Sequence, residues 1–102
     1  MTVVFLPQAR SELDDGADWY EDRQIGLGVL FNRAVQAVLS VLTVHPRLYG
    51  EVSPRVRRRE IRQAPVADFP YTVIYEVRPD ELLILAVAHN SLRPYYWRRR
   101  LA

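Results

Sequence analysis

The stretch that decides the fold is FPYTVIYEVRPDELLILAVAHNSLRPYYWRRR, residues 69–100. Residues 69–77 are rich in β-branched and aromatic side chains, and residues 82–88 form a continuous apolar run of strand length. The polar residues 78–81 lie between them, so the two runs are predicted to pair as an antiparallel hairpin. Because the second run contains no polar side chain, we expect it to be buried on both faces of a sheet.

A third antiparallel strand is predicted just before the hairpin, around Ala64 and Val66. Pro65 lies within it and has no backbone N–H to donate, so this strand should form an edge of the sheet or contain a bulge. Residues 46–54 contain Gly50 and two prolines and are predicted to form a loop.

The N-terminal half changes from strand to helical periodicity. Residues 3–6 form a short β-branched and aromatic run that predicts a first strand. Apolar residues then recur at helical spacing over residues 9–20 and again over residues 27–42. Gly26 and Gly28 interrupt this pattern, which predicts two antiparallel helices joined by a tight turn.

These segments predict one α+β domain over residues 1–102, with a short N-terminal strand, an antiparallel helix hairpin and then a three-stranded antiparallel sheet. The helices should cover one face of the sheet. The opposite face is expected to remain open for function.

Composition limits the possible functions. The chain is 49% hydrophobic and 25% charged, which is typical of a globular protein. It contains no cysteine and only two histidines, so we expect no disulfide, metal site or cofactor. The apolar run at residues 3–6 is too short for a signal peptide, and no later apolar stretch is expected to be long enough to span a membrane. The predicted location is cytoplasmic.

The basic residues are all arginine and are concentrated in the second half. Residues 1–51 carry four arginines and seven carboxylates, whereas residues 52–102 carry ten arginines and five carboxylates. A guanidinium binds carboxylate or phosphate through a planar fork and stays protonated at cellular pH. These side chains can therefore hold an anion but cannot serve as general bases.

Short motifs occur in a fixed order: GLG at residues 26–28 followed by Phe31, FPY at 69–71 followed by Tyr75, AVAH at 86–89, and RPYYWRRR at 93–100. Together they resemble the pattern of the RelE/ParE superfamily of bacterial toxins, and its ParE branch more than its RelE branch. The resemblance implies the RelE/ParE fold and a growth-inhibiting type II toxin. It also implies a cognate antitoxin as partner, whose C-terminal segment wraps around the toxin.

The resemblance leaves three hypotheses for the function. ParE-like members poison DNA gyrase and need no acid or base of their own, which suits a chain without lysine. RelE-like members cut messenger RNA on the ribosome without a metal. A nuclease here would have to take its base from His89, Glu60 or a tyrosine such as Tyr96, with Arg62 and Arg93 holding the phosphate. The third hypothesis is an inert relative that only binds its antitoxin.

Several residues are candidates for binding the antitoxin or the target: Arg57, Arg58, Arg62, Tyr71, Tyr75, Arg93, Trp97 and Arg100. Three of these residues, and also His89, have a structural interpretation as well. His89 ends a buried strand and suits a structural hydrogen bond, and Trp97 suits packing of the C-terminal segment on the sheet. Tyr71 and Tyr75 fall on one face of their strand, as core or antitoxin contacts.

Overall fold

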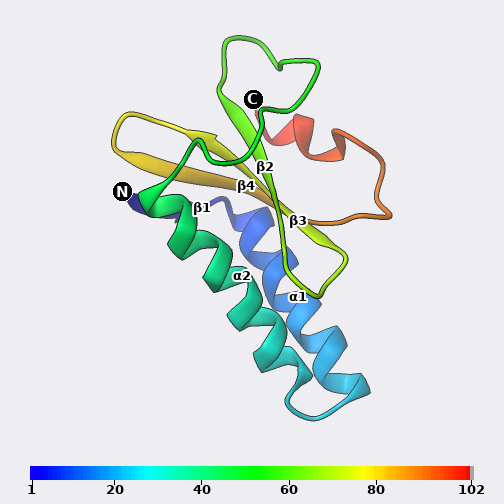
Figure 1. The fold of residues 1–102 in the computed structure, drawn as a ribbon. Helices are drawn as coiled ribbons and strands as arrows, with labels where there is room; N and C mark the ends of the chain where they lie inside the picture. Colours follow the sequence, from blue (N-terminus) through cyan, green and yellow to red (C-terminus); the bar gives the residue numbers. More distant parts are fainter. Residues whose placement is uncertain (102) are drawn as a thin grey trace.

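The computed structural model describes residues 1–101 and confirms the α+β class, with two antiparallel helices against one face of a sheet (Figure 1). The elements in chain order are β1 (Thr2–Phe5), α1 (Pro7–Arg23), α2 (Leu27–Val44), β2 (Ile61–Pro65), β3 (Tyr71–Val77), β4 (Glu81–His89) and the short 3-10 helix η1 (Tyr96–Arg100).

The sheet contains the three predicted antiparallel strands together with β1, in the order β1-β4-β3-β2. β1 pairs parallel to β4, with Thr2 opposite Glu81. A parallel pair needs a long crossover connection, which the helices, β2 and β3 provide here. Two strand predictions are confirmed: β4 is central and buried along most of its length, and β2, which ends at the exposed Pro65, is an edge strand.

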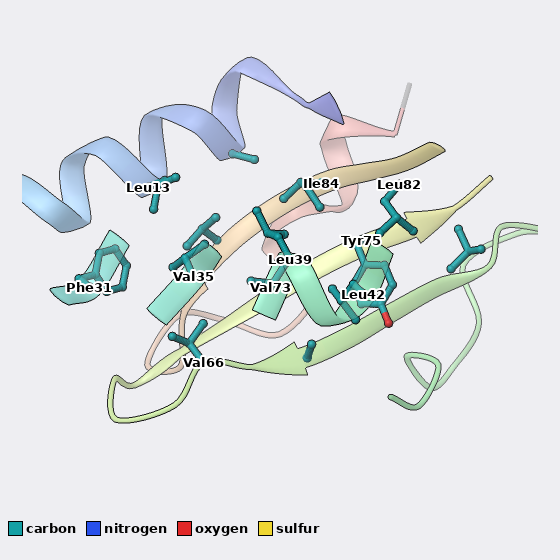
Figure 2. Packing of buried hydrophobic residues seen from close by; sticks show 14 residues of the cluster. Leu13, Phe31, Val35, Leu39, Leu42, Val66, Val73, Tyr75, Leu82 and Ile84 are labelled. Atoms are coloured by element: carbon teal, nitrogen blue, oxygen red, sulfur yellow. The ribbon is translucent and has the colours of Figure 1, made fainter. Parts of the chain in front are cut away.

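The first hydrophobic core lies between the helix hairpin and the sheet (Figure 2). Its large, fully buried side chains include Leu13 from α1, Phe31 and Leu42 from α2, and Val73 and Tyr75 from β3. Burying one such side chain contributes about 1.5–3 kcal/mol. This layer therefore holds the two helices on the sheet.

The GLG motif sets the geometry of the helix hairpin. Gly26 adopts a left-handed conformation, with φ of 89°, which a side chain would disfavour. A Cβ atom at Gly28 would lie 2.5 Å from the Ala17 carbonyl oxygen, so α1 and α2 can approach this closely only at glycine. The Glu21 carboxylate accepts hydrogen bonds from the backbone N–H groups of Gly26 and Gly28 and thereby stabilises the N-terminus of α2.

The opposite face of the sheet is covered, which corrects the expectation that it would be open. Val52 and Val56 from the loop before β2 pack there with Trp97 and Leu101 from the C-terminal segment, in a second hydrophobic cluster. The physical reason is that β3 and β4 also direct apolar side chains to this face, among them Ile74, and these would otherwise form an exposed apolar patch.

β4 contains a β-bulge that places an extra side chain in the second hydrophobic cluster. Ile74 pairs with Ala86 and Tyr75 pairs with Ile84, so Leu85 is an extra residue on β4. Leu85 and Ala86 consequently both contact the second cluster, although they are adjacent in sequence.

Helix α2 corrects a further expectation. Its 18 residues have a mean hydropathy of 1.6, so by length and composition alone the helix could cross a membrane. The core helix of a soluble protein passes the same test. Phe31, Val35, Leu39 and Leu42 of α2 are buried against the sheet and α1, whereas other apolar side chains of the helix are exposed, among them Val29, Leu30, Val41 and Val44.

Candidate functional site

Along part of β4, side chains rather than a neighbouring strand form hydrogen bonds to the outer backbone edge. β1 pairs only with residues 81–84, so the outer edge of β4 has no strand partner from Leu85 onward. Glu12 from α1 accepts a hydrogen bond from the Val87 backbone N–H at 3.1 Å. Arg100 from η1 donates to the Leu85 carbonyl at 2.9 Å. These two hydrogen bonds satisfy part of the unpaired backbone edge of β4.

Glu12, Tyr96 and Arg100 also bind one another, and we call these three residues the Glu12 cluster. The Arg100 guanidinium donates to both carboxylate oxygens of Glu12, at 2.7 and 3.0 Å. The Tyr96 hydroxyl donates to Glu12 Oε2. A two-point guanidinium–carboxylate contact is among the stronger polar interactions in proteins, so the cluster fixes η1 against α1 and β4.

The environment of the Glu12 cluster sets the protonation of its members. Burial, reinforced by the hydrogen bond to Glu12, raises the pKa of Tyr96 well above its usual value. The hydrogen bond to Glu12 also raises the pKa of Arg100, against the opposing effect of burial. Tyr96 therefore stays a neutral hydrogen-bond donor at cellular pH and is unsuited to act as a base.

The aromatic motif residues lie together at the end of the sheet. The Phe31 ring centroid is 4.7 Å from that of Tyr71 and 5.2 Å from that of Phe69, and Tyr20 lies 4.9 Å from Phe69. His89 stands edge-on to Tyr71 at 5.0 Å. Edge-to-face and tilted contacts of this kind are favourable, so the GLG-Phe31, FPY and AVAH motifs meet in one structural cluster.

Two cavities flank His89. The helix groove, of about 590 Å³, lies between α1 and the end of the sheet and is lined by residues including Gly16, Trp19, Tyr71 and His89. The sheet cleft, of about 330 Å³, lies on the other face and is lined by residues including Gln63, Thr72, His89, Arg93 and Trp97.

The His89 ring is oriented by its neighbour Ser91. Its Nδ1 atom accepts a hydrogen bond from the Ser91 backbone N–H at 3.1 Å and lies 2.7 Å from the Ser91 hydroxyl oxygen. In the neutral ring this arrangement places the proton on Nε2. Together with the Tyr71 contact, it agrees with the structural interpretation of His89.

Arg62 lies on the helix side of the sheet. It is paired directly with Tyr75, whose ring is in the first core, and directly paired residues share a face. Its guanidinium is bound by Glu60 at 2.9 Å and by the Tyr49 carbonyl at 2.8 Å, and only 15% of the side chain is exposed. The Arg62 guanidinium is therefore bound within the protein.

Glu60, which binds Arg62, is also an ionic centre of the loop before β2. Arg47 binds its carboxylate through two hydrogen bonds, at 2.8 and 2.9 Å. The hydrogen bond from Arg47 lowers the pKa of Glu60, burial opposes this effect, and the hydrogen bond from Arg62 adds to it.

The predicted aromatic contacts prove to be unequally accessible. Tyr75 is fully buried, its hydroxyl donates to the Pro46 carbonyl at 2.8 Å, and burial raises its pKa to about 12. Trp97 is only 4% exposed, as its packing interpretation requires. Tyr71 is half-buried and lines the helix groove, so it is the most exposed of the three.

One of the four candidate nuclease residues is separated from the other three. Arg62 lies on the helix side of the sheet, while Arg93 lines the sheet cleft on the other face. The Tyr96 hydroxyl is bound to Glu12. His89, Arg93 and Tyr96 therefore line one cleft together, with the Tyr96 hydroxyl engaged by Glu12.

The structure divides the arginines of the second half into two groups. Within residues 1–101, five of them form ion pairs: Arg55, Arg59, Arg62, Arg78 and Arg100. The other five have no ion pair in this part of the chain and are exposed: Arg57, Arg58, Arg93, Arg98 and Arg99. Of the predicted binding arginines, Arg57, Arg58 and Arg93 are therefore free, while Arg62 and Arg100 are engaged.

Sequence reasoning missed Glu12 and Trp19. Glu12 was one of several acidic residues on a helix face, and nothing local distinguishes it from Asp14 or Asp15. Its partners Tyr96 and Arg100 are more than 80 residues away along the chain. Trp19 could have been noticed, because a large aromatic residue is unusual among the acidic residues of this helix. In the structure it lines the helix groove.

Comparison with known proteins agrees with this fold. A sequence model of the family described as "ParE toxin of type II toxin-antitoxin system, parDE" matches residues 3–93. A solved structure described as "Chromosomal ParDE TA system from P. aeruginosa" is similar with a TM-score of 0.60 at 22% identity, over 87% of this chain and 95% of that chain. No curated protein matches.

Proposed function

We propose that this chain, which belongs to the ParE toxin family of type II toxin-antitoxin systems, inhibits DNA gyrase and is neutralised by a cognate antitoxin. The observation that carries the proposal is the family match over residues 3–93. DNA gyrase acts in the cytoplasm, so we also propose that the toxin acts there.

The arrangement of the candidate nuclease residues supports gyrase over messenger RNA as the target. RNA cleavage through the 2′-hydroxyl requires a base, cationic stabilisation of the phosphorane and an acid within reach of one phosphate. Here Arg62 and Arg93 are on different faces, and the Tyr96 hydroxyl is bound to Glu12. A gyrase poison does not need these groups, because gyrase performs the DNA chemistry.

The helix hairpin supports an antitoxin partner. Large apolar side chains are exposed on or beside it: Trp19, Ile25, Val29, Leu30, Val41 and Val44. The helix groove adds Tyr71 beside Trp19. An antitoxin segment that folds on binding can cover such a surface with an amphipathic helix, so we place the antitoxin on this side of the toxin.

The test is a supercoiling assay with purified gyrase and the purified toxin, with and without the antitoxin encoded beside it. We expect the toxin to inhibit supercoiling and to accumulate cleaved DNA, and the antitoxin to restore activity. A folded toxin that leaves gyrase active at large molar excess would contradict the proposal.

A ribosome-dependent endoribonuclease is the second candidate, because His89 and Arg93 line the same cleft. This alternative expects codon-phased cuts in transcripts only when ribosomes are present, and their loss in His89→Ala and Arg93→Ala. A toxin that inhibits neither gyrase nor translation, and whose expression without antitoxin is harmless, would instead be an inert relative.

A further inference from the structure

Apart from Arg23 and Arg33 on the helices, the exposed arginines that form no ion pair within residues 1–101 lie in the loop before β2 and in the C-terminal segment. Arg57 and Arg58 lie in the loop before β2, and Arg98 and Arg99 lie on η1. We call these four residues the arginine surface. Arg93, three residues before η1, is also exposed and without an ion pair among residues 1–101.

The loop and η1 are adjacent in space although about 40 residues separate them. Val52 and Val56 of the loop share the second hydrophobic cluster with Trp97 and Leu101. The Tyr95 hydroxyl donates to the Pro54 carbonyl at 2.9 Å. Figure 1 shows the loop and η1 side by side at one end of the molecule. The fold thus joins two separate arginine pairs into one surface.

Nearby carboxylates do not neutralise this surface, because other arginines already occupy them. Glu51 pairs with Arg55 at 3.2 Å, and Glu60 pairs with Arg47 at 2.8 Å. Glu76 is buried and is bound by Arg78 at 3.0 Å. Among residues 1–101 none of the four guanidinium groups of the arginine surface forms an ion pair, so they are available to an external anion.

The surroundings of these arginines indicate the class of partner. The exposed large hydrophobic side chains nearest in sequence are Leu48 and Leu92, and none is exposed in residues 50–60 or 93–101. The core of a protein–protein interface is depleted of charge and rich in apolar contact. An interface with nucleic acid is more polar and much more positive. The arginine surface fits a phosphate backbone, whereas the apolar helix hairpin fits a protein.

We infer that the arginine surface binds the phosphate backbone of duplex DNA. The inference rests on the proposed function, since DNA bound to gyrase is the nucleic acid that this toxin would meet. The toxin would then contact the DNA as well as the enzyme. No base-specific contact is implied, because a phosphate backbone carries no direct sequence information.

The test measures binding of the purified toxin to a fluorescent duplex DNA by anisotropy, over a range of salt concentrations. Two double variants remove charge from the surface, Arg57→Gln with Arg58→Gln, and Arg98→Gln with Arg99→Gln. The matched control is Arg10→Gln with Arg33→Gln, which removes two exposed charges from the helices. Circular dichroism checks that each variant is folded.

If four phosphate contacts form, affinity should fall about 100-fold when salt rises from about 50 to about 200 mM. Each surface double variant should reduce the slope of log affinity against log salt by about 2, because each contact contributes about 0.9. The control variant should keep the slope of the unmodified protein.

Three outcomes would overturn the inference: no DNA binding at low salt, an equal loss in the helix control, or displacement of DNA by poly-glutamate of matched charge as effectively as by unlabelled duplex. Tighter binding to single-stranded RNA would reject DNA as the ligand. Gyrase inhibition is measured in the separate supercoiling assay. Inhibition without DNA binding would reject only this inference, and DNA binding without inhibition would reject only the proposed function.

Discussion

At the scale of single residues, the role of each arginine depends on whether a carboxylate lies within reach. Arg62 and Arg100 are both predicted binding residues, yet both are held by internal glutamates. Arg57 and Arg98 are exposed and have no ion pair in residues 1–101. The same side chain therefore stabilises the fold at one position and is available for binding at another.

Replacing Tyr75 by Phe should lower the free energy of unfolding by about 1 kcal/mol, because the partly buried Pro46 carbonyl loses its hydrogen-bond donor. Urea unfolding at neutral pH measures the change. Tyr49→Phe is the control, since the Tyr49 hydroxyl makes no hydrogen bond within residues 1–101. Equal effects in the two variants would mean that the Tyr75 hydroxyl is not satisfied by Pro46.

Glu60 should make stability depend on pH in the acid range. Its pKa in the folded state is lowered below the ordinary 4.5, chiefly by the Arg47 hydrogen bond. The stabilising contribution is therefore complete above pH 4.5 and is lost as pH falls through the lowered pKa. Unfolding measured across this range should show a shallower pH dependence in Glu60→Gln, whereas Asp18→Asn should retain the original profile.

At the scale of elements, close contacts decide how the helices and the C-terminal segment pack. The two helices approach so closely that only glycine fits at residue 28. The bulge at Leu85 lets two adjacent side chains of β4 contact the second cluster and leaves the Leu85 carbonyl for Arg100. Both features depend on backbone geometry at a single position.

Replacing Gly28 by Ala should destabilise the protein by about 1–3 kcal/mol, because the new methyl group would meet the Ala17 carbonyl of the facing helix. Thermal and urea unfolding measure the loss. Gly50→Ala provides the control, since a Cβ atom at Gly50 has no neighbour within 4 Å. An unchanged stability in Gly28→Ala would show that the helices can separate at little cost.

At the scale of the whole molecule, the fold separates two surfaces of different character. The apolar surface lies on the helix hairpin, and the arginine surface lies on the loop and η1. The Glu12 cluster connects the two ends of the chain and so fixes the segment that carries Arg98 and Arg99. Two partners could bind these surfaces by different kinds of contact.

Replacing Glu12 by Gln should weaken the attachment of η1 and reduce stability by about 2 kcal/mol, because Arg100 and Tyr96 lose a charged acceptor. Hydrogen exchange should increase first at Val87 and in residues 96–101, ahead of the rest of the sheet. Asp15→Asn, on the same helix, should change neither measurement. A uniform increase in exchange would contradict a local role for Glu12.

The sequence by itself determined the elements and much of their burial. The apolar run at residues 82–88 required a strand buried on both faces, and Pro65 required an edge position or a bulge. Helical periodicity and the pair Gly26 and Gly28 were sufficient for the hairpin. These features follow from local geometry, with periods of 2 and 3.6 residues that a linear sequence displays directly.

Only the tertiary structure decided which distant residues meet. It paired β1 with β4, covered the second face of the sheet, and joined Glu12 to Tyr96 and Arg100. It also decided which arginines are neutralised. An ion pair depends on distances of a few ångströms between groups far apart in the chain, and no local periodicity encodes those distances.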